Sequence, residues 1–206
     1  VHVRGVDARD LLDRLVTQKI ADLSEGGLAQ GFLLDRTGRI LADLVIGHLS
    51  DGEMMIEIDR TDFETVVSAI QDMIFVDDVQ ICSDETAYVF EIHGPSVAEL
   101  LQHAGAELPD EGRLTSYENI GTMLRLDTLG VPGVRICLNL DSVLDVWSRL
   151  ESEGQKGDYP CRLAGWYAFN MARVESLTPW AHIDFGPTSL PHETGLLAKR
   201  VSFTKG

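Results

Sequence analysis

The chain has 206 residues, and 17 Lys and Arg against 33 Asp and Glu give it a formal net charge of −16. A composition of 44% hydrophobic and 24% charged residues is typical of a globular protein and excludes the disordered, collagenous and membrane classes. Lys and Arg drive binding to a phosphate backbone, so the acidic balance argues against nucleic acid as the main partner. An anionic small molecule would need a locally basic pocket.

Cysteine and histidine usage limits the chemistry further. Cys82, Cys137 and Cys161 form no CxxC pair, and the histidines form no cluster at ligand spacing, so we expect neither a disulfide framework nor a metal site. No run approaches about 18 apolar residues, and the start has no signal-peptide pattern. We therefore expect no membrane partner and a location in the cytosol or an organelle matrix. The chain starts without Met inside an apolar alternation, which indicates part of a longer protein.

The first half predicts a strand that leads into a helix, then a three-strand meander, a second helix and a strand. Asp7 is the expected N-cap of the first helix, and the turn at residues 35–38 places Gly38 where a positive φ is needed. The apolar pattern gives these elements, in order: a strand at 1–3, a helix from 7, strands at 32–34, 40–49 and 54–58, a helix from 59 and a strand at 76–82.

The second half repeats this order. Phe90, Ile92 and Gly94 repeat the frame of Val1, Val3 and Gly5, and a helix pattern follows each glycine. Strand patterns at 115–117, 122–126 and 134–138 then precede a helix from Asp141. We therefore predict an α+β protein of two pseudo-repeated modules, residues 1–86 and 87–206, with mostly antiparallel sheets and flanking helices. The polar run at 83–86 favours a boundary near residues 84–88.

Residues 163–175 predict an almost wholly buried helix that carries one Arg and one Glu, Arg173 and Glu175. Two charges at the end of an apolar helix need partners or solvent, because an unpaired buried charge is unfavourable. Arg173 then has two interpretations, a helix-end charge or a clamp for an anionic ligand, since its planar fork suits a carboxylate.

Asp43 interrupts the apolar strand at 40–49. By strand alternation it shares a face with Leu41 and Val45, so it lies either toward solvent or in a cleft. In a cleft, the carboxylate could accept a proton or hold a ring nitrogen. The scattered histidines give no hydrolase pattern, and the glycines at 130 and 133 mark a hairpin tip and not a phosphate loop.

Three segments carry a resemblance: residues 3–17 with 33–43, residues 92–101, and residues 173–206. Together they resemble the folate-binding glycine-cleavage T-protein superfamily. The final run, Val201-Ser202-Phe203-Thr204-Lys205-Gly206, is similar to its YgfZ-type branch, which is tied to iron–sulfur cluster assembly or repair. In that branch Lys-Gly is followed at once by Cys-Tyr, and this chain stops one residue before the cysteine.

The resemblance implies modules around a channel that takes tetrahydrofolate, with an N-terminal segment and a C-terminal β domain missing from this chain. It matches Asp43 to the catalytic Asp that lies beside the reacting folate nitrogens of the aminomethyltransferases. The folate contacts that it implies are Asp43, Asp59, Arg125, Arg135, Arg173 and Lys205.

The sequence departs from the aminomethyltransferase pattern at three positions. Ala42 stands where the family has a first Asp, Asp59 where it has Asn, and Arg135 where it has the pteridine-binding Glu. The Arg side chain has only hydrogen-bond donors, so it cannot accept hydrogen bonds from the N–H groups of a pterin.

We therefore favour a tetrahydrofolate-binding protein that supports iron–sulfur client or assembly proteins. Two alternatives stay open: a folate-dependent aminomethyltransferase, and a non-catalytic scaffold that binds proteins through its acidic surface.

Overall fold

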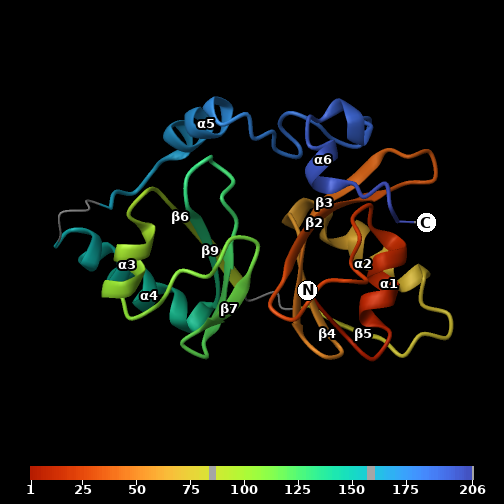
Figure 1. Ribbon diagram of the computed structural model, residues 1–206, viewed down its shortest axis with the longest axis horizontal. Helices are drawn as coiled ribbons and strands as arrows, with labels where there is room; N and C mark the ends of the chain where they lie inside the picture. Colours follow the sequence, from red (N-terminus) through yellow and green to blue (C-terminus); the bar gives the residue numbers. More distant parts are fainter. Residues whose placement is uncertain (84–86, 157–160, 206) are drawn as a thin grey trace. The chain divides into compact units, whose positions relative to one another are not determined.

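The computed structural model describes residues 1–83, 87–156 and 161–205. The chain forms two compact units, one of Val1–Asp84 with Pro179–Gly206 and one of Glu85–Thr178. Of the predicted boundary at 84–88, residues 84–86 lie outside the described part. The predicted α+β architecture with mostly antiparallel sheets is confirmed, and each unit is described by itself below (Figure 1).

The first unit is built on a five-stranded antiparallel sheet in the order β2-β3-β4-β1-β5. Its helices α1 and α2 pack against each other and against the sheet. The meander β2-β3-β4 lies where the apolar runs predict it, but the last strand is shorter than the predicted 76–82. The elements are β1 (His2–Arg4), α1 (Ala8–Leu15), β2 (Leu28–Leu34), β3 (Ile40–Ser50), β4 (Glu53–Glu57), a 3₁₀ turn (Arg60–Asp62), α2 (Phe63–Asp72) and β5 (Gln80–Cys82).

Both faces of this sheet are covered. Ala42, Leu44 and Ile46 of β3 are buried in a core that also holds Leu11 of α1 and Val66 of α2. A second core contains Phe32 of β2 together with Phe185 and Leu196 of the C-terminal segment. That segment contains a 3₁₀ turn (Pro191–Glu193) and α6 (Leu197–Arg200), and α6 lies next to β2 (Figure 1).

The C-terminal segment corrects the predicted module 87–206. Residues from Pro179 onward belong to the first unit, because their apolar side chains complete its second core. The rings of Phe185 and Phe32, for example, meet edge to face with centroids 5.9 Å apart. The sequence prediction placed this irregular stretch in the second module because it follows that module directly in the chain.

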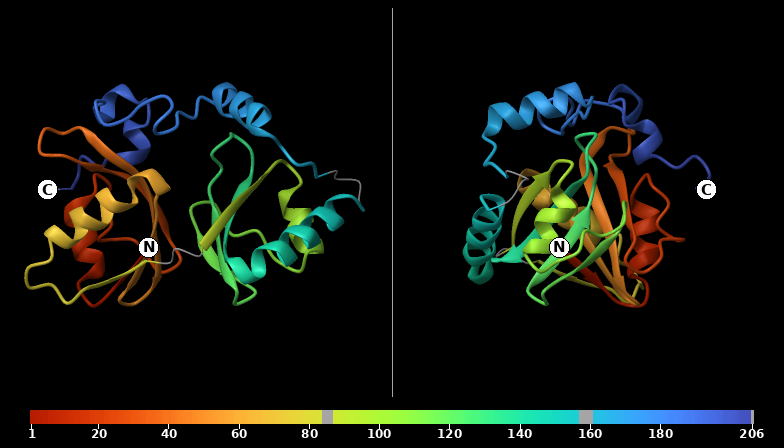
Figure 2. Two further views of the ribbon diagram at one scale, coloured as in Figure 1. Left: turned by 180° about the vertical axis from the view of Figure 1, so that it is seen from behind. Right: turned by 60° about the vertical axis from the view of Figure 1, so that its left-hand side comes forward.

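The second unit repeats the topology of the first. Its four-stranded sheet has the order β6-β9-β8-β7, which corresponds to β1-β4-β3-β2 of the first unit. Helices α3 and α4 lie side by side on one face of this sheet (Figure 2). The elements are β6 (Ala87–His93), α3 (Val97–His103), β7 (Leu114–Tyr117), β8 (Gly121–Arg125), β9 (Gly133–Asn139), α4 (Leu140–Gly154) and α5 (Trp166–Glu175).

Helix α5 is exposed, whereas the sequence predicts a buried helix over 163–175. Tyr167 and Met171 are 85% and 62% exposed, and Arg173 is the buried residue of the helix. Within its unit, α5 contributes Phe169, whose ring lies 6.3 Å from the ring of His93. The prediction was wrong because a high apolar content does not by itself provide a surface on which a helix can pack.

Among the described residues, no helix is long and apolar enough to cross a membrane. The same part of the chain holds no group of three or more His, Cys, Asp or Glu arranged to bind a metal ion.

Candidate functional site

Asp43 projects from β3 on the sheet face that the C-terminal segment covers. Its register partner on β2 is Phe32, and cross-strand partners share a face, so Asp43 lies opposite α1 and α2. The side chain is 16% exposed. The solvent-facing interpretation of Asp43 therefore does not describe this carboxylate.

Arg200 of α6 holds Asp43 through both carboxylate oxygens. Its Nε donates to Oδ1 at 2.8 Å and its Nη2 donates to Oδ2 at 3.3 Å, while Nη1 donates to Oε1 of Gln30 on β2. The Arg200 side chain is only 10% exposed. A two-pronged, charge-assisted contact of this kind fixes the position and orientation of the carboxylate.

Thr17 fixes the same helix end to the sheet. Its Oγ1 donates to the carbonyl oxygen of Arg200 at 2.6 Å and accepts from the backbone N–H of Phe32 at 2.8 Å. The carbonyl of Thr17 in turn accepts from the N–H of Ser202 at 3.0 Å. The backbone around Arg200 is therefore anchored independently of its side chain.

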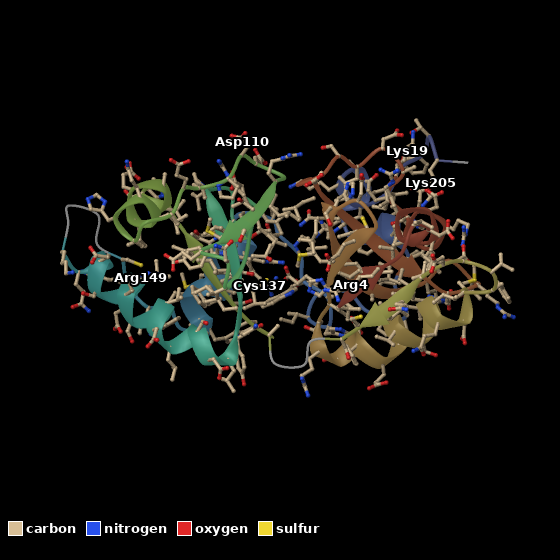
Figure 3. The ribbon with its side chains drawn as sticks, turned by 90° about the horizontal axis from the view of Figure 1, so that it is seen from below. Arg4, Lys19, Asp110, Cys137, Arg149 and Lys205 are labelled. Atoms are coloured by element: carbon tan, nitrogen blue, oxygen red, sulfur yellow. The ribbon has the colours of Figure 1, made fainter. Side chains whose placement is uncertain are left out.

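Lys205 contacts the segment that follows α1 in the same unit. Its Nζ donates to the carbonyls of Val16 and Gln18 at 2.6 and 3.2 Å, and Oδ2 of Asp13 lies 3.8 Å away. Burial lowers the pKa of Lys205, and the Asp13 charge opposes that shift. Figure 3 shows Lys205 beside the segment that carries Lys19.

Asp59 is exposed and has a local structural contact. Its carboxylate accepts from the backbone N–H of Thr61 at 2.8 Å, which caps the 3₁₀ turn before α2. In the described part of the first unit, the hydrogen bond of Asp59 to Thr61 is separate from the contacts of Asp43 with Arg200 and of Lys205 with Val16.

In the second unit, Arg135 of β9 faces a carboxylate of its own sheet. Its register partner is Glu91 of β6, and Arg135 Nε lies 2.6 Å from Glu91 Oε1. The other oxygen, Oε2, lies 2.6 Å from Nε2 of His93. Glu91 is 23% exposed, so this row of polar side chains, Arg135, Glu91 and His93, is largely withdrawn from water. A carboxylate is therefore present directly beside the position where the resemblance expects one.

We expect this row to make the stability of the second unit depend on pH. Burial on its own raises the pKa of Glu91, but the His93 hydrogen bond and the Arg135 charge outweigh it and hold the pKa below its ordinary value of 4.5. A carboxyl group whose pKa is lowered by folding stabilises the folded state at pH values above its pKa in the unfolded chain. This stabilisation is lost as the pH falls through the pKa of the group in the folded protein. The urea concentration at the unfolding midpoint of the wild type should therefore decrease as the pH is lowered below about 4.5. Glu91→Gln should give a shallower decline, and an equally steep one would contradict this assignment.

Arg125 has a separate structural partner. Its Nε and Nη2 donate to the two carboxylate oxygens of Asp127, each at 3.2 Å, and its Nη1 donates to the carbonyl of Pro109 at 3.0 Å. Asp127 also accepts from the N–H of Gly133 at 2.9 Å, across the predicted hairpin. These contacts give Arg125 the role of closing the hairpin between β8 and β9.

Arg173 is 4% exposed and lies at the end of α5. Its Nη1 donates to the carbonyl of Thr178 at 3.4 Å, and its own carbonyl accepts from Oγ of Ser176 at 3.1 Å. Both contacts lie within five residues of Arg173 along the chain. The geometry corresponds to the helix-end interpretation of this residue, and the clamp interpretation stays a prediction.

Sequence reasoning missed Arg200, Gln30 and Glu91. Arg200 is separated from Asp43 by 157 positions, and the motif that drew attention to the C-terminal run starts one residue later. Glu91 could have been found, because it alternates with the core residues Phe90 and Ile92 on a predicted strand and so shares a face with His93.

The fold and these contacts define an α+β protein of two repeated modules, with a paired carboxylate on one sheet face. The model of the GCVT N-terminal domain family matches residues 1–205, so the chain belongs to that family. It is 25% identical to an aminomethyltransferase of Cutibacterium acnes, over 100% of this chain and 58% of the relative. An aminomethyltransferase of Thermotoga maritima is 26% identical over 94% of this chain and 55% of its own.

A solved structure shares the fold. The glycine cleavage system aminomethyltransferase T from Bartonella henselae superposes with a TM-score of 0.88 at 20% identity, over 98% of this chain and 55% of that one. The match to the GCVT N-terminal domain family confirms the predicted membership of the T-protein superfamily. The chain spans little more than half the length of the relatives it matches.

Proposed function

We propose that this protein binds tetrahydrofolate or a one-carbon derivative of it, with Asp43 beside the folate ring. Membership of the GCVT N-terminal domain family supports a folate ligand, since the relatives are aminomethyltransferases. We further propose that it belongs to the YgfZ-type branch and supports iron–sulfur client or assembly proteins. The run from Val201 to Gly206 supports this branch. The cytosol or an organelle matrix is the proposed compartment.

The observation that carries the proposal is the pairing of Asp43 with Arg200. Both of its oxygens accept hydrogen bonds from Arg200, at 2.8 and 3.3 Å. With both oxygens directed toward the guanidinium of Arg200, the carboxylate is held in one orientation and is not left free to approach a reacting folate nitrogen. The contacts favour a protein that holds a folate over one that moves protons during aminomethyl transfer.

A transfer assay separates the two activities. We expect the full chain, supplied with tetrahydrofolate and an aminomethyl-loaded carrier protein, to release no ammonia above the background rate. Turnover that disappears in Asp43→Asn would replace our proposal with an aminomethyltransferase, the activity named for the relatives.

A cellular assay tests the iron–sulfur role. In cells that lack the protein, the wild type should restore the activity of iron–sulfur enzymes, whereas Asp43→Asn should not. Equal restoration by Asp43→Asn would contradict a folate-dependent role and favour a scaffold that binds proteins alone.

A further inference from the structure

Asp43 and Arg200 together carry no net charge, while Glu57 of β4, the register partner of Val45, lies on the same sheet face as this pair. Asp43 contributes one negative charge and Arg200 one positive charge, and the third member of the group, Gln30, is neutral. Lys205 and Asp13, further along this unit, likewise form an oppositely charged pair at 3.8 Å. The side chains of Asp43 and Arg200 are only 16% and 10% exposed, so water screens their charges weakly. Each charge is therefore neutralised mainly by the other.

The one-carbon forms of tetrahydrofolate differ in charge at the ring. The 5,10-methenyl form is a cation, with its charge spread over N5, the bridging carbon and N10, whereas the 5-formyl form is an uncharged amide at N5. Both forms carry the same anionic tail. A bare carboxylate beside the ring would attract the cation, but a carboxylate already neutralised by a guanidinium attracts it far less.

We propose that Arg200 makes this site select uncharged one-carbon forms of tetrahydrofolate over the methenyl cation. The inference rests on the proposed function, because it takes Asp43 to lie beside the bound folate ring. Arg200 is then a specificity-determining residue that acts through the charge of Asp43. This selectivity depends on the position of α6 against the sheet, because the hydrogen bonds of Thr17 hold the backbone of Arg200 in place.

A charge series on the full chain tests the proposal. Arg200→Met leaves the pair with one negative charge, Asp43→Asn leaves one positive charge, and the double variant is neutral like the wild type. The readout is the ratio of the dissociation constants for 5-formyltetrahydrofolate and 5,10-methenyltetrahydrofolate, titrated in mildly acidic buffer in which the cation persists. We expect the relative affinity for the cation to rise about tenfold in Arg200→Met, to fall about tenfold in Asp43→Asn, and to return to the wild-type value in the double variant.

Arg39→Met is the matched control. Arg39 also ties the C-terminal segment to the sheet, since its Nη1 donates to the carbonyl of Thr188, and its backbone N–H donates to Asp35 and not to Asp43. Its ratio should stay within about twofold of the wild type. If Arg200→Met does not fold, the opposite shift in Asp43→Asn and the recovery in the double variant still decide the result.

The outcomes are distinguishable. If the ratio of the two dissociation constants does not change across the charge series, the proposed selectivity is wrong, although folate binding is still supported. Wild-type protein that binds neither form would overturn the proposed function itself, and the selectivity with it.

Discussion

Gly5→Ala is expected to unfold the first unit. Gly5 has φ +136°, and a Cβ at this position would lie 1.8 Å from the carbonyl oxygen of Asp78 and 2.9 Å from Cα of Val79. Both atoms are backbone, so relief requires β5 to move away from the centre of the sheet. Adding the strained φ to this overlap, we expect a loss of about 4 kcal/mol or more. Urea unfolding, with hydrogen exchange to localise the loss to the first unit, measures it.

The repeat supplies a matched control for this substitution. Gly94 occupies the equivalent place after β6, with φ +145°, but a Cβ there meets nothing within 4 Å. Gly94→Ala therefore carries the backbone strain without the overlap and should cost about 1–2 kcal/mol. Equal losses for the two substitutions would show that φ alone decides, and that the close approach of Asp78 contributes nothing.

Arg200→Met is the second substitution for which we expect a large effect. It removes the guanidinium and leaves Asp43, whose side chain is 16% exposed in the intact pair, without its charge partner. Breaking a buried ion pair from one side costs about 3 kcal/mol or more, because the remaining charge keeps its desolvation penalty. The loss should appear as a lower urea midpoint and as faster exchange of amides in β2, β3 and α6.

The double variant separates this cause from lost packing. Asp43→Asn together with Arg200→Met removes both charges, so it should recover most of the stability lost in Arg200→Met alone. Arg39→Met, which cuts an exposed contact to Thr188, should cost less than about 1 kcal/mol. A double variant no more stable than Arg200→Met would show that the side chain of Arg200 stabilises the unit by packing and not by its charge.

The repeated topology could be predicted because it follows from local patterns. The frame of Val1, Val3 and Gly5 recurs at Phe90, Ile92 and Gly94, and both frames lead into a helix and then into an antiparallel meander. Each step depends on residues close in sequence. The order within the meanders β2-β3-β4 and β7-β8-β9 then follows from joining neighbouring strands by short connections.

The site could be predicted only in part. Asp43 was found because a charge inside an apolar strand is visible locally, but its partner Arg200 comes from the other end of the chain. The exposure of α5 and the docking of residues 179–205 onto the first unit are also tertiary outcomes. Periodicity indicates which face of an element is apolar, and it does not indicate which surface that face meets.

Folate binding is the central claim, and calorimetric titration of 5-formyltetrahydrofolate into the full chain tests it most directly, with Asp43→Asn in parallel. We expect saturable binding in the wild type and an affinity about tenfold lower, or about 1.4 kcal/mol weaker, in Asp43→Asn. Absence of both binding heat and a thermal shift at high ligand concentration would contradict it and direct attention to protein partners.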